Sequence, residues 1–266
     1  MDIRVTLAAT GPVPESLLAL IPAPISTTVD ETAYGQRINL YARHDDPAAL
    51  RQALRAVAGN VAVGVLTRPL AAQPARLLLL DVDSTLTTTE AVDLLAEHAG
   101  AGERVAEITE RAMRGELDFA ESLRERVATL KGLSVTVFSD VGPRMTLSPG
   151  AEDLIRAAKA AGAKVGITSG GFTQLVGPLA RILGLDFCNA NRLETETVGG
   201  VERLTGRVVG DIVDRQQKAR DLLRFAHEHK VDAELTVAVG DGANDVDMFD
   251  AAGLSVAYCA KPAAAA

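Results

Sequence analysis

Four aspartates follow two apolar segments that lie far apart in the sequence. Asp81 and Asp83 come directly after the all-leucine segment 77–80, and Asp241 and Asp245 lie in a glycine-rich segment after the other. Apolar segments of this kind are typical of strands buried on both faces of a parallel sheet. Open α/β folds bind ligands at the carboxyl ends of such strands. If the two strands are neighbours, the four carboxylates crowd one edge and repel unless a cation lies among them.

The oxygen donors of this cluster indicate a magnesium site. Neither motif contains His or Cys, and hard oxygen ligands suit Mg²⁺ rather than Zn²⁺ or Cu²⁺. The second motif, Gly240-Asp-Gly-Ala-Asn-Asp245, superficially matches the dinucleotide pattern G-x-G-x-x-G. Asp245 stands where the third glycine belongs, and its carboxylate would repel a pyrophosphate, so a dinucleotide site is excluded. The alternative for Asp81 and Asp83 alone is a solvated strand exit.

A third apolar segment ends in Thr168-Ser169-Gly170-Gly171, ahead of a helical pattern. A hydroxyl, flexible glycine backbone and the N–H groups of a helix start favour an anion such as phosphate. Lys218 lies near the start of another helical segment. Taken singly, Ser-Gly-Gly is also a common turn, and a lone lysine is usually a solvated surface residue.

Strands and helices alternate from Arg76 onward, which predicts an α/β fold with a Rossmann-like parallel sheet covered on both faces. The predicted strands are Arg76–Leu80, Ala163–Ile167, Leu185–Cys188, Leu235–Val239 and Leu254–Ala257. The predicted helices are Ala151–Ala161, Gln174–Leu183, Arg215–His229 and Val246–Ala252. Residues Leu193 to Val209, centred on Gly199-Gly200, predict a β-hairpin. The helical pattern from Glu90 to Leu130 is too long for a crossover connection and predicts an inserted helical cap at about 90–140.

The N-terminal part predicts a small α+β domain of residues 1–68. Its apolar β-branched segments and its Gly and Pro positions predict the order βαββαβ, the ferredoxin-like pattern. The elements are Ile3–Ala9, Pro14–Leu20, Ile25–Asp30, Arg37–Arg43, Pro47–Ala58 and Val61–Leu66. Two prolines among small residues indicate a linker at 69–75, so that the second domain spans 76–266.

Composition and charge exclude several classes of protein. The chain has 266 residues, 47% of them hydrophobic, and a net charge of −8, which argues against disorder and against nucleic acid as the main partner. Two cysteines are too few for a disulfide scaffold or a cysteine-based metal site. No apolar run approaches the roughly 20 residues that span a bilayer, and the N-terminus lacks a signal-peptide pattern. We therefore expect a cytoplasmic protein with no membrane partner.

The motifs in order resemble the haloacid dehalogenase superfamily of phosphohydrolases: Asp-Val-Asp-Ser-Thr, Thr-Ser-Gly, Lys218 and Gly-Asp-Gly-Ala-Asn-Asp. The resemblance implies that Asp81 is a nucleophile forming an aspartyl-phosphate, and that Asp83 is the acid and base. It implies Mg²⁺ held by Asp81, the Asp83 backbone carbonyl and Asp241, with Asp245 in support. It assigns the transferring phosphoryl group to Ser169, Gly170, Lys218 and Asn244.

The cap narrows the resemblance to the phosphoserine phosphatases of that superfamily, which release L-serine in the last step of serine biosynthesis. That resemblance implies that Glu90 binds the substrate ammonium, that Arg126 binds its carboxylate, and that Met113 and Phe119 form an apolar lid. Each has a plainer alternative. Glu90 could carry charge near a helix start, Arg126 could pair within its own helix, and Met113 and Phe119 could be cap core.

Two further alternatives concern the function of the whole chain. A related phosphatase or phosphotransferase could act on another small phosphomonoester. A regulatory protein could accept phosphate on Asp81 without turnover, although an intact Asp83 speaks against it. The N-terminal part resembles ACT-type domains, which implies an amino-acid effector and pairing into a homodimer; the alternative is a ferredoxin-like domain that binds nothing.

Overall fold

The computed structural model describes residues 1–260 and divides the chain into two compact units, Met1–Pro74 and Ala75–Ala266. The last six residues of the predicted second domain, 261–266, lie outside the described residues. Among the described residues, none of the helices is long and apolar enough to cross a membrane.

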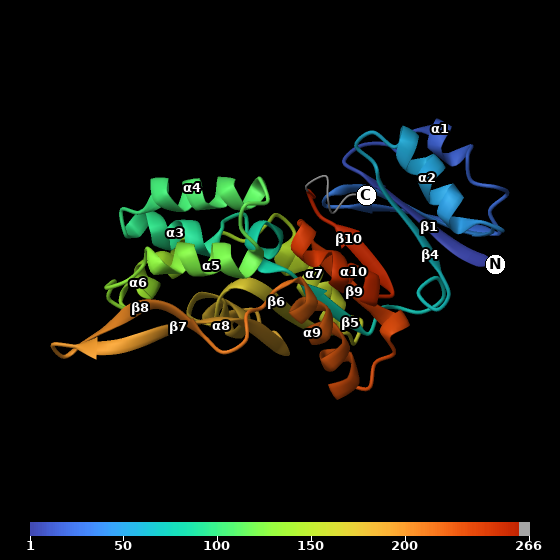
Figure 1. Ribbon diagram of the computed structural model, residues 1–266. Coiled ribbons are helices and arrows are strands. Elements are labelled where there is room, and N and C mark those ends of the chain that lie inside the picture. The colour runs from blue at the N-terminus through green and yellow to red at the C-terminus, as the bar shows by residue number, and fades with distance from the viewer. Residues whose placement is uncertain (261–266) are drawn as a thin grey trace. The chain divides into compact units, whose positions relative to one another are not determined.

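The N-terminal unit is an antiparallel four-stranded sheet with two helices, in the order β2-β3-β1-β4 (Figure 1). Its elements are β1 (Asp2–Ala9), α1 (Glu15–Leu18), β2 (Ser26–Thr32), β3 (Gly35–Arg43), α2 (Pro47–Val57) and β4 (Ala62–Thr67). Alternate residues of β1, including Val5 and Leu7, are buried in one cluster with Leu17 of α1 and Leu54 of α2. The predicted ferredoxin-like order of a small α+β domain is confirmed.

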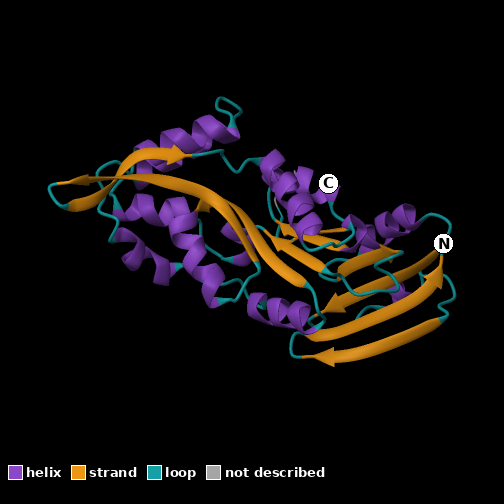
Figure 2. Cartoon of the chain, turned by 90° about the horizontal axis from the view of Figure 1, so that it is seen from below, coloured by secondary structure: helices purple, strands orange, loops and turns teal. Residues whose placement is uncertain are grey.

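The second unit is built on a six-stranded sheet in the order β10-β9-β5-β6-β7-β8 (Figures 1 and 2). The strands are β5 (Leu77–Leu80), β6 (Lys164–Phe172), β7 (Phe187–Val198), β8 (Val201–Val209), β9 (Thr236–Gly240) and β10 (Leu254–Ala257). All neighbours are parallel except β7 and β8, which form an antiparallel hairpin. The helices between strands are α7 (Ala151–Ala160), α8 (Thr173–Ile182), α9 (Arg215–Glu228) and α10 (Val246–Ala251). The predicted α/β fold is confirmed.

Burial on both faces explains the all-leucine sequence of β5. Leu77 and Leu79 are fully buried in a cluster with Phe225 of α9 and Met248 of α10. Leu78 and Leu80 belong to a second cluster, which also contains residues of α7 and α8. Because successive side chains of a strand point to opposite faces, only an unbroken apolar run satisfies both clusters. The strand therefore ends abruptly where the first aspartate begins.

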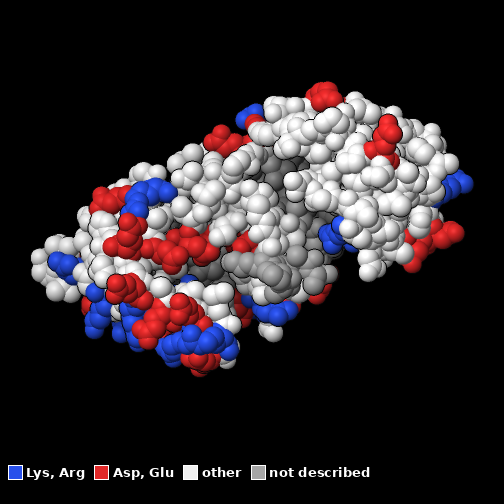
Figure 3. All heavy atoms as spheres, turned by 90° about the horizontal axis from the view of Figure 1, so that it is seen from above, with Lys and Arg blue, Asp and Glu red and all other residues white. Residues whose placement is uncertain are grey.

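A helical cap is inserted between β5 and α7. It consists of α3 (Ala91–His98), α4 (Gly102–Met113), α5 (Phe119–Ala128) and α6 (Val137–Val141). Asp118 caps α5 by accepting from the N–H of Glu121, whose side chain accepts from the Asp118 N–H in return. Acidic and basic side chains gather together over the cap (Figure 3), where Arg111 and Arg114 form ion pairs with neighbouring glutamates. This face is a solvated surface of mixed charge.

Two strands extend further than the sequence predicts. Strand β6 continues beyond Ile167 through the Ser-Gly-Gly segment to Phe172, so that α8 begins after it. Strand β7 runs without a break from Phe187 to Val198, which joins the predicted strand 185–188 to the first half of the predicted hairpin. No glycine or proline interrupts residues 187–198, so nothing in this segment forces the chain out of the extended conformation.

Candidate active site

Three adjacent strands bring the sequence motifs to one edge of the sheet. Strand β5 pairs with β9 on one side and with β6 on the other, parallel in both cases. Asp81 follows β5, Asp241 follows β9, and Ser169 lies in the last part of β6. The N–H of Asp81 donates to the carbonyl of Val239 (2.8 Å), which fixes the ends of β5 and β9 against each other. The sheet order therefore places these motifs side by side.

Three of the aspartates form a compact carboxylate group. Asp81, Asp241 and Asp245 each offer one carboxylate oxygen, and these atoms lie within 4.8 Å of one another. All three side chains belong to buried residues. Buried oxygen donors at this spacing fit a hard divalent cation better than a soft metal. The carboxylate of Asp83 is not part of this group.

The glycine-rich turn at the end of β9 brings the side chain of Asp245 back toward the sheet. Its Oδ2 accepts hydrogen bonds from the N–H groups of Asp241 (3.1 Å) and Gly242 (3.0 Å). A side chain on Gly240 would overlap the carboxylate of Asp245, so glycine alone fits beneath it. The pattern that superficially matches a dinucleotide motif is thus a turn that presents carboxylates.

Lys218 lies between two of these carboxylates. It is fully buried, and its Nζ is 2.8 Å from Oδ1 of Asp81 and 2.7 Å from Oδ1 of Asp245. Burial opposes the charged ammonium, but the two carboxylates outweigh it and raise the pKa of Lys218. Burial also raises the pKa of Asp81 to about 8, although Lys218 acts in the opposite direction. One ammonium does not neutralise three carboxylates, so the donor set fits an added cation.

Asp83 is held apart from the carboxylate group by two hydrogen bonds. Its Oδ1 accepts from the N–H of Ala91 (2.7 Å), and its Oδ2 accepts from Oγ of Ser169 (3.3 Å). Burial, and next the nearby charge of Glu90, raise the pKa of Asp83 to about 6. A carboxyl with a pKa closer to neutrality than usual is suited to donate a proton and take it back.

The end of β6 forms a narrow cradle beneath the cap. Ser169 is buried, and its Oγ also accepts from the N–H of Gly171 (2.8 Å). A Cβ on Gly170 would lie 3.0 Å from Cζ of Phe119, the first residue of α5. The cap aromatic therefore packs directly over Gly170. Asn244 lies in the turn after β9, half-buried beside Gly242.

The cap supplies the remaining predicted residues. Arg126 on α5 is half-buried, and this burial lowers the pKa of its guanidinium, while the charges of Glu90, Asp93 and Asp83 act in the opposite direction. Its Nε donates weakly to the Ser122 carbonyl (3.4 Å), and within residues 1–260 it has no ion pair shorter than 4.0 Å. Among the described residues, Arg126 is thus a half-buried cation that forms no ion pair with another side chain of its helix.

The other two cap residues differ in exposure. Phe119 is half-buried over the end of β6, whereas Met113, at the end of α4, is 81% exposed. The predicted lid therefore has one member packed against the site and one facing solvent. The pairing of both residues over the reacting group stays a prediction.

Two buried polar residues near the site were not predicted from the sequence. Asp221 of α9 is fully buried and accepts hydrogen bonds from Thr168 (2.8 Å), Asn189 (2.6 Å), Gln217 (2.9 Å) and Arg224 (3.1 Å). Asn191 of β7 donates to the Gly170 carbonyl (2.8 Å) and accepts from the N–H of Val213 (2.9 Å). Asp221 follows Lys218 by three residues and so lies on the same face of α9, and this spacing could have indicated that Asp221 is buried near the site. Nothing in the sequence around Asn191 distinguishes it.

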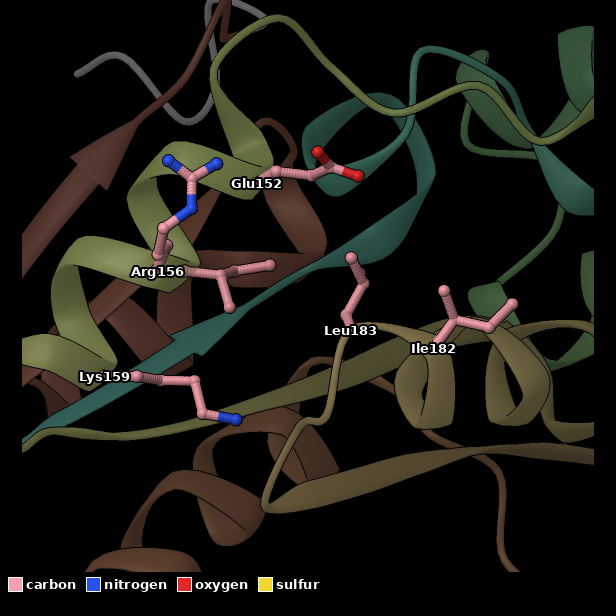
Figure 4. A pocket seen from close by; sticks show the side chains of 6 residues that line it. Glu152, Arg156, Lys159, Ile182 and Leu183 are labelled. Atoms are coloured by element: carbon pink, nitrogen blue, oxygen red, sulfur yellow. The ribbon is translucent and has the colours of Figure 1, made fainter.

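A pocket of about 330 Å³ lies between α7 and the end of α8 (Figure 4). Its lining consists of Glu152, Ile155, Arg156, Lys159, Ile182 and Leu183. None of these is a predicted site residue. Lys159 donates to the carbonyl of Gly184 and so helps to fix the end of α8.

Known proteins are similar to this chain in sequence and in fold. The model of the haloacid dehalogenase-like hydrolase family matches residues 78–250. The phosphoserine phosphatase SerB2 of Mycobacterium tuberculosis is 54% identical over 204 residues, which cover 77% of this chain and 49% of the relative. The phosphoserine phosphatase of Lactococcus lactis is 49% identical over 187 residues, which cover 70% of this chain and 85% of the relative.

A solved structure resembles nearly the whole chain. The HAD family hydrolase t0658 of Salmonella enterica serovar Typhi superimposes on this chain with a TM-score of 0.85 at 27% identity. The match covers 98% of this chain and 90% of the hydrolase chain. The chain spans about half the length of the first two curated relatives, 49% and 52%. From the matched motifs and the shared fold, the chain belongs to the haloacid dehalogenase-like hydrolase family, in which these relatives are phosphoserine phosphatases.

Proposed function

We propose that the chain is a Mg²⁺-dependent phosphoserine phosphatase that releases L-serine and phosphate. The observation that carries the proposal is the placement of Asp81 against Lys218, with Asp83 hydrogen-bonded to Ser169 at the adjoining strand end. This arrangement supports the assignment of a nucleophile, a proton donor and a phosphate-binding segment to one edge of the sheet. The printed names of the relatives support the choice of substrate.

In the first step, a carboxylate oxygen of Asp81 attacks the phosphorus of the substrate. The new Asp81–phosphorus bond forms as the bond from phosphorus to the serine oxygen breaks, and the carboxyl of Asp83 gives its proton to that oxygen. Lys218, Ser169 and the backbone of Gly170 bind the phosphoryl oxygens and offset their charge. Serine leaves as the neutral alcohol.

In the second step, water attacks the phosphorus and the bond to Asp81 breaks. Asp83, now ionised, takes the proton from the attacking water, which regenerates both carboxyl groups in their starting forms. Asn244 positions the phosphoryl group or the water. The raised pKa of Asp83, about 6, suits a group that must act as acid and then as base.

The cation would be held by Asp81, the backbone carbonyl of Asp83 and Asp241, with Asp245 in support. The close approach of the Asp81, Asp241 and Asp245 carboxylates supports this assignment. When bound, Mg²⁺ offsets the negative charge of the transferring phosphoryl group and of the carboxylates.

The amino-acid part of the substrate is assigned to the cap. Arg126 is assigned to the substrate carboxylate, because it is a half-buried guanidinium that forms no ion pair shorter than 4.0 Å among residues 1–260. Glu90 binds the ammonium. Phe119 over Gly170 excludes water from the reacting group, and Met113, which faces solvent in this structure, stays a predicted second member of this lid.

For the N-terminal unit we propose that it binds an amino-acid effector and pairs between two copies of the chain. The ferredoxin-like sheet order supports this assignment. Light scattering of the full chain is expected to give the mass of a dimer. Serine is expected to alter phosphoserine turnover by the Arg126→Ala variant as it alters turnover by the wild type. A monomer whose turnover responds to no amino acid would contradict the proposal.

A panel of phosphomonoesters tests the proposed activity. Phosphate release is expected to show the highest kcat/KM for phosphoserine, to stop when EDTA removes the metal, and to return with Mg²⁺. A higher kcat/KM for another small phosphomonoester would favour the alternative enzyme. Absence of phosphate release from every ester would contradict a phosphatase.

Removal of Asp241 is expected to change the response of the protein to Mg²⁺. Wild-type protein should melt at a higher temperature with Mg²⁺ than with EDTA. At a Mg²⁺ concentration 100 times the dissociation constant, the free energy of unfolding should rise by about 2.7 kcal/mol. Asp241→Asn should melt higher than wild type in EDTA, because one of three repelling carboxylates is gone, but should gain little from Mg²⁺. Differential scanning calorimetry measures both. An equal Mg²⁺ gain in variant and wild type would exclude Asp241 as a ligand.

Gly170→Ala is expected to lower kcat/KM by roughly tenfold or more, because the added methyl group displaces Phe119 from its place over the cradle. Gly177→Ala on α8 is the matched control, since a Cβ there meets nothing closer than 3.9 Å. Steady-state kinetics with phosphoserine compares them. Equal activity in the two variants would show that close packing over Gly170 is unimportant.

A further inference from the structure

Ser84, between the predicted acid Asp83 and the rest of the loop, has an unusual backbone conformation. Its φ is 58° and its ψ is 7°, the left-handed region that side-chain-bearing residues rarely adopt. Within residues 1–260, only two other residues besides glycine have positive φ, Lys230 and Cys259. A glycine at position 84 would adopt this conformation without strain. We therefore expect the side chain of Ser84 to have a role that glycine could not fill.

The side chain of Ser84 makes one contact that the loop itself does not need. Its Oγ donates to Oε1 of Glu90 at 2.9 Å. Within residues 1–260, this is the hydrogen bond that the Glu90 carboxylate accepts, and it involves Oε1 and not Oε2. Glu90 is the residue at the N-terminal cap of α3, yet its side chain accepts no hydrogen bond from that helix. Ser84 thus holds one oxygen and leaves the other free.

Two adjacent loop residues, Asp83 and Ser84, form hydrogen bonds with two adjacent residues at the start of the cap. Asp83 accepts from the N–H of Ala91 (2.7 Å), while Ser84 donates to Glu90. The left-handed turn at Ser84 is what allows two successive side chains to reach the same helix start. The orientation of Glu90 is therefore tied to the backbone of the loop that carries the acid Asp83.

We propose that Ser84 is a positioning residue, which holds the Glu90 carboxylate in the orientation that binds the substrate ammonium. This rests on the proposed function. Ser84 contributes a neutral donor to one Glu90 oxygen, so the carboxylate keeps its negative charge and its second oxygen for the ammonium. Its effect is on discrimination between substrates with and without that ammonium, and it takes no part in the transfer of the phosphoryl group.

The test compares phosphoserine with 3-phosphooxypropanoate, which differs only in lacking the ammonium. Ser84→Ala and Ser84→Gly should both lower kcat/KM for phosphoserine by about tenfold, the scale of one hydrogen bond to a charged group. The loss for the analogue should be much smaller. In the Glu90→Gln background, Ser84→Ala should cause little further loss, because the group that it positions is already altered.

Strain is separated from positioning by melting temperature. Ser84→Gly should melt higher than Ser84→Ala, because it removes the left-handed strain, yet the two should lose selectivity equally. Lys230→Gly is the matched control: it relieves the same strain at an exposed position at the end of α9 and should keep wild-type selectivity. Wild-type selectivity in Ser84→Ala, or equal losses on both substrates, would overturn the proposal. A wild-type enzyme without preference for phosphoserine would instead overturn the proposed function itself.

Discussion

Asp81→Asn is expected to lower the turnover of phosphoserine by roughly 10³-fold or more, because loss of a nucleophile removes the covalent route entirely. The amide is close in size and can still accept from Lys218, which lies 2.8 Å from the carboxylate. The effect should therefore fall on kcat, with the fold unchanged. Continuous phosphate detection under saturating phosphoserine measures it.

The matched control for this variant is Asp250→Asn, which makes the same change at an exposed position of α10. It should keep wild-type kcat. Circular dichroism should show folded protein for both variants. Turnover of Asp81→Asn within tenfold of wild type would rule out Asp81 as the nucleophile.

Arg126→Ala is expected to lower kcat/KM for phosphoserine by roughly 10²-fold, the scale of losing one partner of a buried charge pair. The loss on p-nitrophenyl phosphate, which has no carboxylate, should be much smaller. Arg126→Lys should recover only part of the loss, since an ammonium cannot form the two parallel hydrogen bonds of a guanidinium. The selectivity between the two substrates is the measured quantity.

Arg124→Ala provides the comparison for Arg126. It removes the same side chain two residues earlier on α5, where Arg124 is exposed. It should leave both substrates unaffected. Equal losses on phosphoserine and p-nitrophenyl phosphate in Arg126→Ala would show that Arg126 supports the cap and does not bind the substrate carboxylate.

The elements that carry the chemistry could be predicted because their sequences admit few other structures. Four leucines followed by Asp81 are typical of a strand buried on both faces that ends at a polar edge. Gly240 and Gly242, at the end of β9 and just after it, indicate a turn. The ferredoxin-like order was likewise readable from β-branched segments and their spacing.

Other features depend on which elements become neighbours, and this the local sequence does not encode. Asp221 is satisfied by donors from β6, β7 and α9 together, so its role appears only when those elements meet. Strand β7 is continuous because its pairing with β6 and then β8 carries the chain through 187–198. The left-handed conformation of Ser84 could not be predicted either, since it is rare for a residue with a side chain and serine does not signal it.

Trapping the phosphorylated protein tests the central claim, that Asp81 carries the phosphoryl group. In Asp83→Asn with p-nitrophenyl phosphate and Mg²⁺, the leaving group needs no proton, so transfer to Asp81 should proceed while hydrolysis stalls. We expect a burst of about one equivalent of p-nitrophenolate per protein, with the phosphoryl group on the peptide containing Asp81 by mass spectrometry. No burst and no phosphorylated peptide, or a phosphoryl group on another residue, would contradict the mechanism.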